Sequence, residues 1–309
     1  MRGGGQEFDR LRAIFARLGA GAAGLGDDCA LIPFGATTLA VSIDCSLEGV
    51  HFRTDWLTFE EIGWRSAAAA LSDLAADGAA PVGVLVSLGM PGAVSRERGA
   101  DPGVEIMAGV AAAAQSVGAK VLGGDLVKSE KYLVDVCVLG TAERPVRRAG
   151  ARDGDGVWVT GRLGGAGLAL AAFRAGTRPG GALGARYVRP EPRIAAGRWL
   201  AAHGATAMLD ISDGLAADAG HLAAASEVGL EIALERLPCW TGVAPLAAAA
   251  SGEEFELLVT LPPSFSETPD FELTRIGTCF RGGGVRLLEG NTPVALPAGY
   301  DHFAPPPPP

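Results

Sequence analysis

Aspartates that stand within two residues of glycine or serine, mostly where a β-rich run or a turn ends, limit more than any other feature how this chain can fold. In the clearest example, residues 38–52 read TLAVSIDCSLEGVHF, and a β-rich run stops at Asp44. Rigid backbone at a strand end positions such a carboxylate, and the following loop leaves it open to a ligand. A single aspartate of this kind is usually a turn residue, so the pattern gains weight by repetition.

The same pattern occurs at five places in the chain. The aspartates concerned are Asp27 and Asp28, Asp44, Asp73, Asp125, and Asp210 with Asp213. Their carboxylates suit hard cations such as Mg²⁺, which take oxygen ligands and keep some of their waters. Without a cation, clustering them is unfavourable because like charges raise one another's pKa. The repetition favours a Mg²⁺ site, and a turn or cap role is the alternative for each single aspartate.

Two of these places resemble each other. Ser72-Asp73 and Ser212-Asp213 are Ser-Asp pairs that each enter an Ala-rich helix, one in each half of the chain. Ser and Asp satisfy free backbone N–H groups at helix starts. Helix capping therefore explains each pair as well as metal binding does.

Segments with helical and strand-like patterns alternate along the chain. Helices are predicted over 6–19, 59–76, 101–117, 192–203 and 215–226, and from residue 168 onward. A turn into a short strand is predicted over 26–32. Further strands are predicted over 38–44, 82–88, 120–125, 132–140, 157–160, 206–211, 255–261 and 285–288, and a Gly/Ala loop over 176–186. This alternation favours an α/β or α+β fold with mixed sheets over an all-α or all-β fold.

The length of 309 residues suits two domains. The polar, Gly-rich segment 147–156 is the predicted seam. We therefore expect an N-terminal domain over 1–146 and a C-terminal α/β domain over 147–304. Residues 305–309 are a polyproline tail, which we expect to be disordered or extended.

Composition excludes several classes of function. The net charge of −9 disfavours a nucleic-acid partner. No apolar run has the length needed to span a bilayer, and the N-terminus has no apolar segment typical of a secretory signal. The five cysteines are scattered and never form a CxxC pair, which indicates reduced thiols in a cytoplasmic protein and no zinc site.

The sequence lacks the common signatures of nucleotide binding and catalysis. The turn at 161–167 lies between a strand and a helix, as a phosphate-binding turn would, but its glycines do not fit GxGxxG. Close helix–strand packing is the favoured explanation of these glycines. GxxxxGK[ST], GxSxG, HExxH and HRD motifs are missing from the sequence. Among the histidines, His51 is retained as a candidate because it shares the loop after Asp44.

Motifs along almost the whole chain resemble those of thiamine-monophosphate kinases. They are GDDCAL at 26–31, SID at 42–44, EGVHF at 48–52, LSDLAADGAAP at 71–81, GGD at 123–125, RAGARDGD at 148–155, LDISDGL at 209–215 and GYDHF at 299–303. EGVHF and GYDHF are the specific ones, since relatives such as aminoimidazole ribonucleotide synthetase and selenophosphate synthetase share the Asp motifs. Two positions depart from the family pattern. Ile43 stands where Thr is common, which removes a side-chain hydroxyl ligand, and 251–257 reads SGEEFEL in place of GGEDYEL.

The resemblance implies a cytoplasmic enzyme that uses ATP and Mg²⁺ to phosphorylate thiamine monophosphate, giving thiamine diphosphate. It also implies the two-domain aminoimidazole ribonucleotide synthetase-like fold and a homodimer whose contact is the N-terminal sheet. The implied Mg²⁺ ligands are Asp28, Ser42, Asp44, Asp73, Asp125, Asp210 and Asp213, of which Asp44, Asp125 and Asp213 are the candidate catalytic residues. The implied ATP contacts are Gly124, Asp125, Arg148 and Ser212, and the implied substrate contacts are His51, Glu253 and Tyr300.

The chemistry of this reaction agrees with the residues present. The acceptor is a phosphate oxygen that is already anionic near neutral pH, so it needs no general base. The reaction needs charge neutralisation and in-line positioning of two polyanions. Two alternatives stay open: another ATP-using enzyme of the same superfamily, and a non-catalytic nucleotide-binding regulator. A selenide enzyme is disfavoured because residues 1–26 carry no cysteine.

Overall fold

The first half of the chain forms a five-stranded mixed sheet in the order β1-β2-β5-β3-β4. The computed structural model describes residues 6–22, 24–92, 101–300 and 302–303, so the predicted tail at 305–309 lies outside the described residues. The elements of this half are α1 (Gln6–Leu18), η1 (Gly19–Ala22), β1 (Ala30–Phe34), β2 (Thr37–Leu47), α2 (Phe59–Ala76), β3 (Ala80–Met90), α3 (Pro102–Ser116), β4 (Lys120–Lys128) and β5 (Leu133–Ala142). β3 and β4 are parallel, and the other neighbouring strands are antiparallel.

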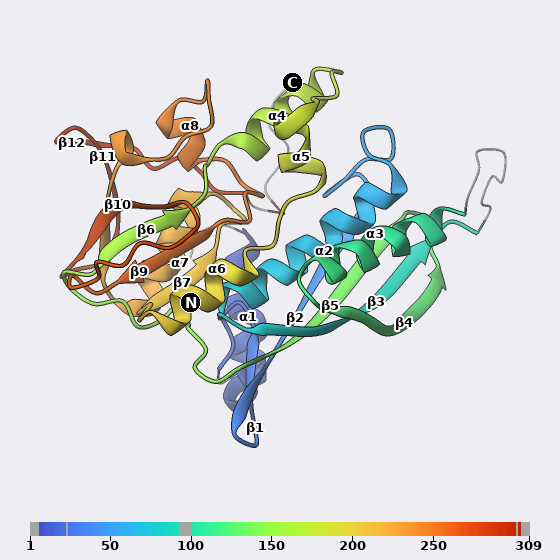
Figure 1. Cartoon of the computed structure of the whole chain (residues 1–309), viewed down its shortest axis with the longest axis horizontal. Coiled ribbons are helices and arrows are strands. Elements are labelled where there is room, and N and C mark those ends of the chain that lie inside the picture. Colours follow the sequence, from blue (N-terminus) through green and yellow to red (C-terminus); the bar gives the residue numbers. More distant parts are fainter. Residues whose placement is uncertain (1–5, 23, 93–100, 301, 304–309) are drawn as a thin grey trace.

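Helices α2 and α3 pack against each other and cover one face of this sheet (Figure 1). Apolar residues alternate along β5, and the buried ones, Val134, Val136 and Val138, face the helices. The two helices approach closely because each carries a glycine at the crossing. A Cβ on Gly63 would lie 1.9 Å from the Ile106 carbonyl oxygen, so no side chain fits there.

The opposite face of the first sheet exposes apolar side chains, among them Ile43 and Leu85. Strand register places a polar row across this face, because Cys45 pairs with Asp135, Asp135 with Ser87, and Ser87 with Asp125. Successive side chains of a strand point to opposite faces. Ser42 and Asp44 of β2 therefore face α2, while Ile43 faces away from it.

The second half of the chain forms a seven-stranded sheet in the order β12-β11-β8-β10-β6-β9-β7. Its elements are β6 (Gly156–Thr160), α4 (Gly165–Arg174), α5 (Gly181–Val188), α6 (Ile194–Ala202), β7 (Ala207–Asp210), α7 (Leu215–Ser226), β8 (Gly229–Ala233), η3 (Leu234–Arg236), α8 (Pro245–Ala249), β9 (Leu257–Leu261), β10 (Leu273–Phe280), β11 (Gly284–Glu289) and β12 (Thr292–Val294). Helix α7 packs on β7, β8 and β11, and helix α6 packs on α2 of the first half. The two halves therefore meet along α2.

The predicted fold class, α/β with mixed sheets in two domains, is confirmed. The predicted seam lies in the connection between β5 and β6. The predicted loop at 176–186 is wrong in its second part, because α5 begins at Gly181. Elements α8, β8, β10 and β12 were not predicted. None of the helices in the described ranges is long and apolar enough to cross a bilayer.

Candidate active site

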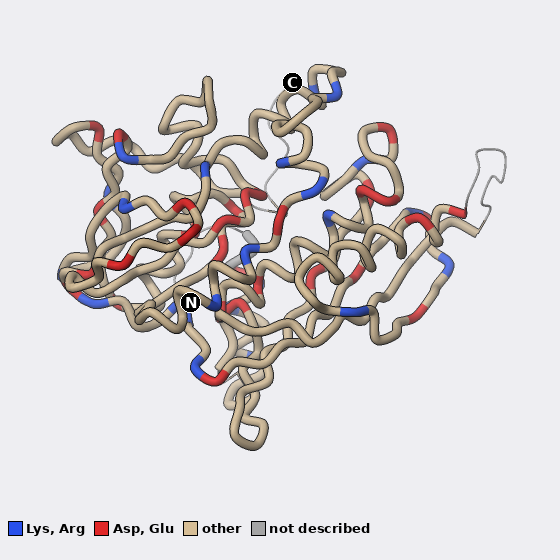
Figure 2. Tube along the Cα trace, in the orientation of Figure 1, with Lys and Arg blue, Asp and Glu red and all other residues tan. Residues whose placement is uncertain are grey.

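Three of the predicted aspartates converge where the two halves of the molecule meet. Asp28 precedes β1, Asp73 lies in α2 and Asp210 ends β7, and one carboxylate oxygen of each lies within 4.8 Å of the others. Acidic positions gather along this junction between the two halves, with basic positions beside them (Figure 2). Tertiary folding thus brings together segments that are far apart in sequence.

Each of these carboxylates has a donor that fixes its orientation. Ser42 donates its hydroxyl to Asp73 at 2.5 Å, and Ser72 donates its hydroxyl to Asp210 at 2.7 Å. Arg148 donates Nε and Nη2 to the two oxygens of Asp28, at 3.1 and 2.8 Å. The predicted residues Ser42 and Arg148 therefore contact the group directly.

The capping interpretation is wrong for Ser72-Asp73. Ser72 and Asp73 lie inside α2, which begins at Phe59 after the capping box of Thr58 and Glu61. Ser72 is fully buried and contacts Asp210 of the other half of the chain. Its role was not predicted, since its only sequence signal is its place before Asp73.

Burial makes the negative charge of this group unfavourable. Burial, and then the charge of Asp28, raises the pKa of Asp210 to about 7. Burial, and then Asp210 and Asp28, raises the pKa of Asp73 well above its ordinary value. A divalent cation relieves such repulsion. The atoms that could bind a metal ion here are all carboxylate and hydroxyl oxygens, which fits Mg²⁺.

Asp44 lies between this group and a second set of residues. It projects from β2 on the side of α2, and burial, then Glu253 and Asp135, raises its pKa to about 6. The positive fields of His302 and Arg65 lower this pKa. Asp44 therefore sits within electrostatic reach of the predicted acceptor contacts.

The predicted acceptor contacts form a wall of rings next to a carboxylate. The rings of His51 and Tyr300 lie 5.1 and 4.9 Å from that of His302. The backbone N–H of Leu47 donates to His51 Nδ1 at 3.0 Å, which assigns the ring proton of a neutral His51 to Nε2. Glu253 lies beside them, within electrostatic reach of His51. His302 was not singled out from the sequence, although the GYDHF motif contains it.

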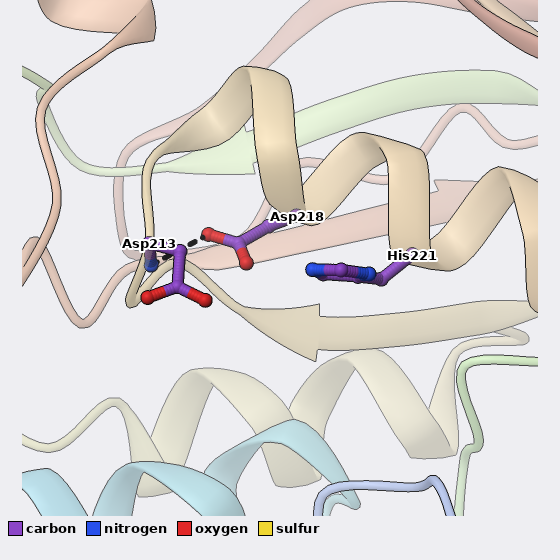
Figure 3. Close-up of side chains that lie close together, drawn as sticks. All are labelled: Asp213, Asp218 and His221. Carbon is purple, nitrogen blue, oxygen red and sulfur yellow. Dashed lines mark hydrogen bonds between the residues drawn. The ribbon is translucent and has the colours of Figure 1, made fainter. Parts of the chain in front are cut away.

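The loop after β7 carries the predicted residues Ser212 and Asp213. Their backbone N–H groups both donate to Asp218 Oδ2, at 3.1 Å, so Asp218 shapes this loop. Asp213, Asp218 and His221 lie along one side of the start of α7, and one ligand atom of each lies within 4.8 Å of the others (Figure 3). Burial, and then Arg148, lowers the pKa of His221 to about 4, so its ring is neutral. Asp218 and His221 were not predicted.

Asp125 is not brought to the group of three carboxylates within one chain. It lies on the exposed edge strand β4 and points to the face of the sheet opposite to Asp44. Its Oδ1 accepts a hydrogen bond from its neighbour Leu126 at 2.9 Å. Gly124 has a local reason to be glycine, since a Cβ there would lie 1.9 Å from the Val86 carbonyl oxygen. The roles of Asp125 and Gly124 in binding stay predictions.

The glycine turn at 161–167 is occupied by a side chain of the protein. Glu254 Oε1 accepts the backbone N–H groups of Gly164 and Ala166 at 2.8 and 3.2 Å, and Arg186 pairs with the same carboxylate. The start of α4 is therefore neutralised from within the fold and does not serve as a phosphate site.

Comparison with known proteins agrees with this geometry. Residues 26–142 match the AIR synthase related protein, N-terminal domain, and residues 152–270 match the C-terminal domain of the same family. The chain is 38% identical to a thiamine-monophosphate kinase of Halobacterium salinarum, over 82% of this chain and 85% of that protein. It is 35% identical to the Aquifex aeolicus protein of the same name, over 90% and 92%.

Solved structures extend the likeness to three dimensions. The structure titled "AaThiL complexed with AMPPCP and TMP" superposes with a TM-score of 0.88 at 33% identity, covering 96% of this chain and 97% of that one. A hydrogenase maturation protein HypE superposes with a TM-score of 0.73 at 17% identity, which shows only a shared fold.

Proposed function

The chain belongs to the thiamine-monophosphate kinase family of the AIR synthase related proteins and is a kinase, and on that premise we propose that it transfers the γ-phosphate of ATP directly to the phosphate of thiamine monophosphate. The observation that carries this proposal is the convergence of Asp28, Asp73 and Asp210 beside Arg148. Such a group can accept the phosphates of two polyanions only through cations, which is what phosphoryl transfer between phosphates requires.

We propose that these carboxylates, with Ser42, Asp44 and Asp213, hold Mg²⁺. Bound Mg²⁺ neutralises the phosphate oxygens and the charge that develops during transfer. The hydroxyls of Ser42 and Ser72 keep the carboxylates of Asp73 and Asp210 in place. Arg148 can share its guanidinium between Asp28 and an ATP phosphate, because a guanidinium carries five N–H donors.

The acceptor is proposed to bind at the ring wall of His51, His302 and Tyr300. An aromatic wall beside the carboxylate of Glu253 suits a flat, positively charged ring system. The acceptor phosphate would then point toward Asp44 and the metal site. Its anionic oxygen attacks without a general base, because the phosphate oxygen carries no proton that must be removed.

We also propose a homodimer formed through the exposed face of the first sheet. This face combines exposed apolar side chains such as Ile43 and Leu85 with the polar row that ends in Asp125. Exposed apolar patches of this kind mark contact surfaces. Since Asp125 lies on this face, away from the three-carboxylate group of its own chain, its proposed contact with ATP and Mg²⁺ requires the dimer.

Release of ADP tests the function. With ATP and Mg²⁺, we expect ADP release only when thiamine monophosphate is added. ADP release with another acceptor alone would favour a different enzyme of the superfamily. Binding of ATP without turnover under any of these conditions would favour a regulator.

The free thiols of all five cysteines fit a reducing compartment, and we propose the cytoplasm.

A further inference from the structure

A buried arginine lies between the metal side and the acceptor side of the site. Arg65 projects from α2 and has a side chain only 5% exposed. Its guanidinium carbon lies 3.9 Å from the centre of the Tyr187 ring, and Nη1 donates to the Tyr187 carbonyl oxygen. Its Nη2 forms an ion pair with Glu253 Oε1 at 2.6 Å and has no partner of hydrogen-bonding geometry among the described residues. A buried charge of this kind is costly unless a partner fixes it.

The partner, Glu253, is held in an unusual backbone conformation. Its φ is 56°, and that of Phe255 is 49°, both in the left-handed region that non-glycine residues avoid. Such a conformation is unfavourable and persists where the surroundings impose it. Here the backbone N–H of Glu253 donates to the Ser212 carbonyl at 2.6 Å, and that of Phe255 to the Ile211 carbonyl at 2.9 Å. The strained segment is thus fastened to the loop that carries Asp213.

Glu253 is more accessible than Arg65. The Glu253 side chain is 33% exposed, while that of Arg65 is almost completely enclosed. Arg65 therefore cannot contact an acceptor in this arrangement, whereas the carboxylate of Glu253 can. Any effect of Arg65 on the acceptor must act through Glu253.

We propose that Arg65 is a positioning residue, which through its ion pair with Glu253 holds that carboxylate against the cationic ring of the acceptor. The inference rests on the proposed function and adds to it a residue that the sequence did not single out. Stacking on Tyr187 fixes the guanidinium, the guanidinium fixes the Glu253 side chain, and Ser212 fixes the Glu253 backbone. The acceptor subsite is thereby tied to the metal-binding loop of Asp213.

A purely structural role for Arg65 makes different predictions, and kinetics separates the two. The variants are Arg65→Met, Arg65→Lys, Glu253→Gln and the double variant Arg65→Met/Glu253→Gln. The matched control is Arg189→Met, since Arg189 also pairs with α2, through Glu60 at 2.7 Å, but lies on the surface. KM for thiamine monophosphate, KM for ATP, kcat and Tm are measured for each.

We expect Arg65→Met to raise KM for thiamine monophosphate at least about tenfold, with KM for ATP within about twofold of wild type. Arg65→Lys should recover part of the loss, because lysine keeps the charge but not the fork geometry. The double variant should be no worse than Glu253→Gln alone, since the two residues act as one unit. Arg189→Met should match wild type.

Equal increases in KM for thiamine monophosphate and KM for ATP would overturn the proposal. So would a double variant whose increase in KM for thiamine monophosphate is the product of the increases in the two single variants. If Arg65→Met fails to fold, Arg65→Lys and Glu253→Gln still decide, because the proposal requires both to change KM for the acceptor selectively. Wild-type turnover of thiamine monophosphate is the internal reference. If wild type does not turn over thiamine monophosphate, the proposed function itself is refuted. If it does, but substitution of Arg65 changes both KM values equally, only this inference is refuted.

Discussion

Asp210 is a single residue whose burial disfavours the negative charge that its proposed role requires. It is almost fully buried, receives a hydrogen bond from Ser72, and faces Asp28 and Asp73. Asp210→Asn should therefore abolish most turnover, by at least about a hundredfold, because a proposed cation ligand is lost. It should leave Tm in metal-free buffer unchanged or higher, because one repulsive charge is removed.

Steady-state rates and thermal melts in EDTA measure both effects. Asp153→Asn is the control, since Asp153 is half-exposed and pairs with Arg281 on the surface. Near-normal turnover of Asp210→Asn at saturating Mg²⁺ would mean that the carboxylate is structural.

Asp77 is a buried carboxylate outside the proposed mechanism. Neither of its oxygens has a hydrogen-bond partner among the described residues, and burial, then Asp28, raises its pKa from 3.8 to about 8. Between these two values the folded state holds a proton that the unfolded state has lost. The free energy of unfolding therefore falls as the pH rises from about 4 to about 8. Asp77 contributes at most about 1.4 kcal/mol to this fall for each pH unit.

Asp77→Asn should remove this dependence. Urea unfolding at several pH values should give a flatter profile for the variant, and a higher free energy of unfolding than wild type near pH 8. Parallel profiles for the two proteins would show that Asp77 does not carry the raised pKa.

At the scale of an element, the start of α4 depends on Glu254. This fully buried carboxylate accepts the N–H groups of Gly164 and Ala166 and pairs with Arg186. Glu254→Ala should destabilise the protein by about 3–5 kcal/mol, because it leaves a buried cation and two amides without that partner. Glu272→Ala should cost no more than about 1 kcal/mol, since Glu272 is exposed and so is its ion pair with Arg162. Equal free energies of unfolding for the two variants would contradict this account of α4.

Elements with a clear local pattern could be predicted from the sequence. Helix α2, strands β2 and β5 and the loop after β7 follow from their own residues. Helix α5 and strand β8 could not be predicted, because Ala- and Gly-rich segments fit either face of any element and their structure depends on packing. The three converging aspartates, Asp28, Asp73 and Asp210, could be singled out one by one from the sequence. The roles of Ser72, Arg65 and Asp218 could not, since each depends on a contact made only in the folded chain.

At the scale of the whole molecule, the position of Asp125 distinguishes a site within one chain from a site shared by two. If Asp125 serves the partner's site, mixed dimers of Asp125→Asn and Asp210→Asn contain one site with both native residues. Mixing the two inactive variants under conditions that exchange subunits should then restore about a quarter of wild-type activity, by random pairing of two kinds of subunit. Mixtures that stay inactive although subunits exchange would assign Asp125 to its own chain or to no site.

Carboxylates from both halves of the chain are proposed to assemble a metal site for phosphoryl transfer to thiamine monophosphate. Phosphorus NMR of a reaction with ATP, Mg²⁺ and thiamine monophosphate tests this proposal. We predict that the monophosphate signal is replaced by the two coupled signals of thiamine diphosphate as ADP forms, and that EDTA or Asp210→Asn prevents this. Inorganic phosphate in place of the diphosphate, or unchanged product formation by Asp210→Asn, would contradict the proposal.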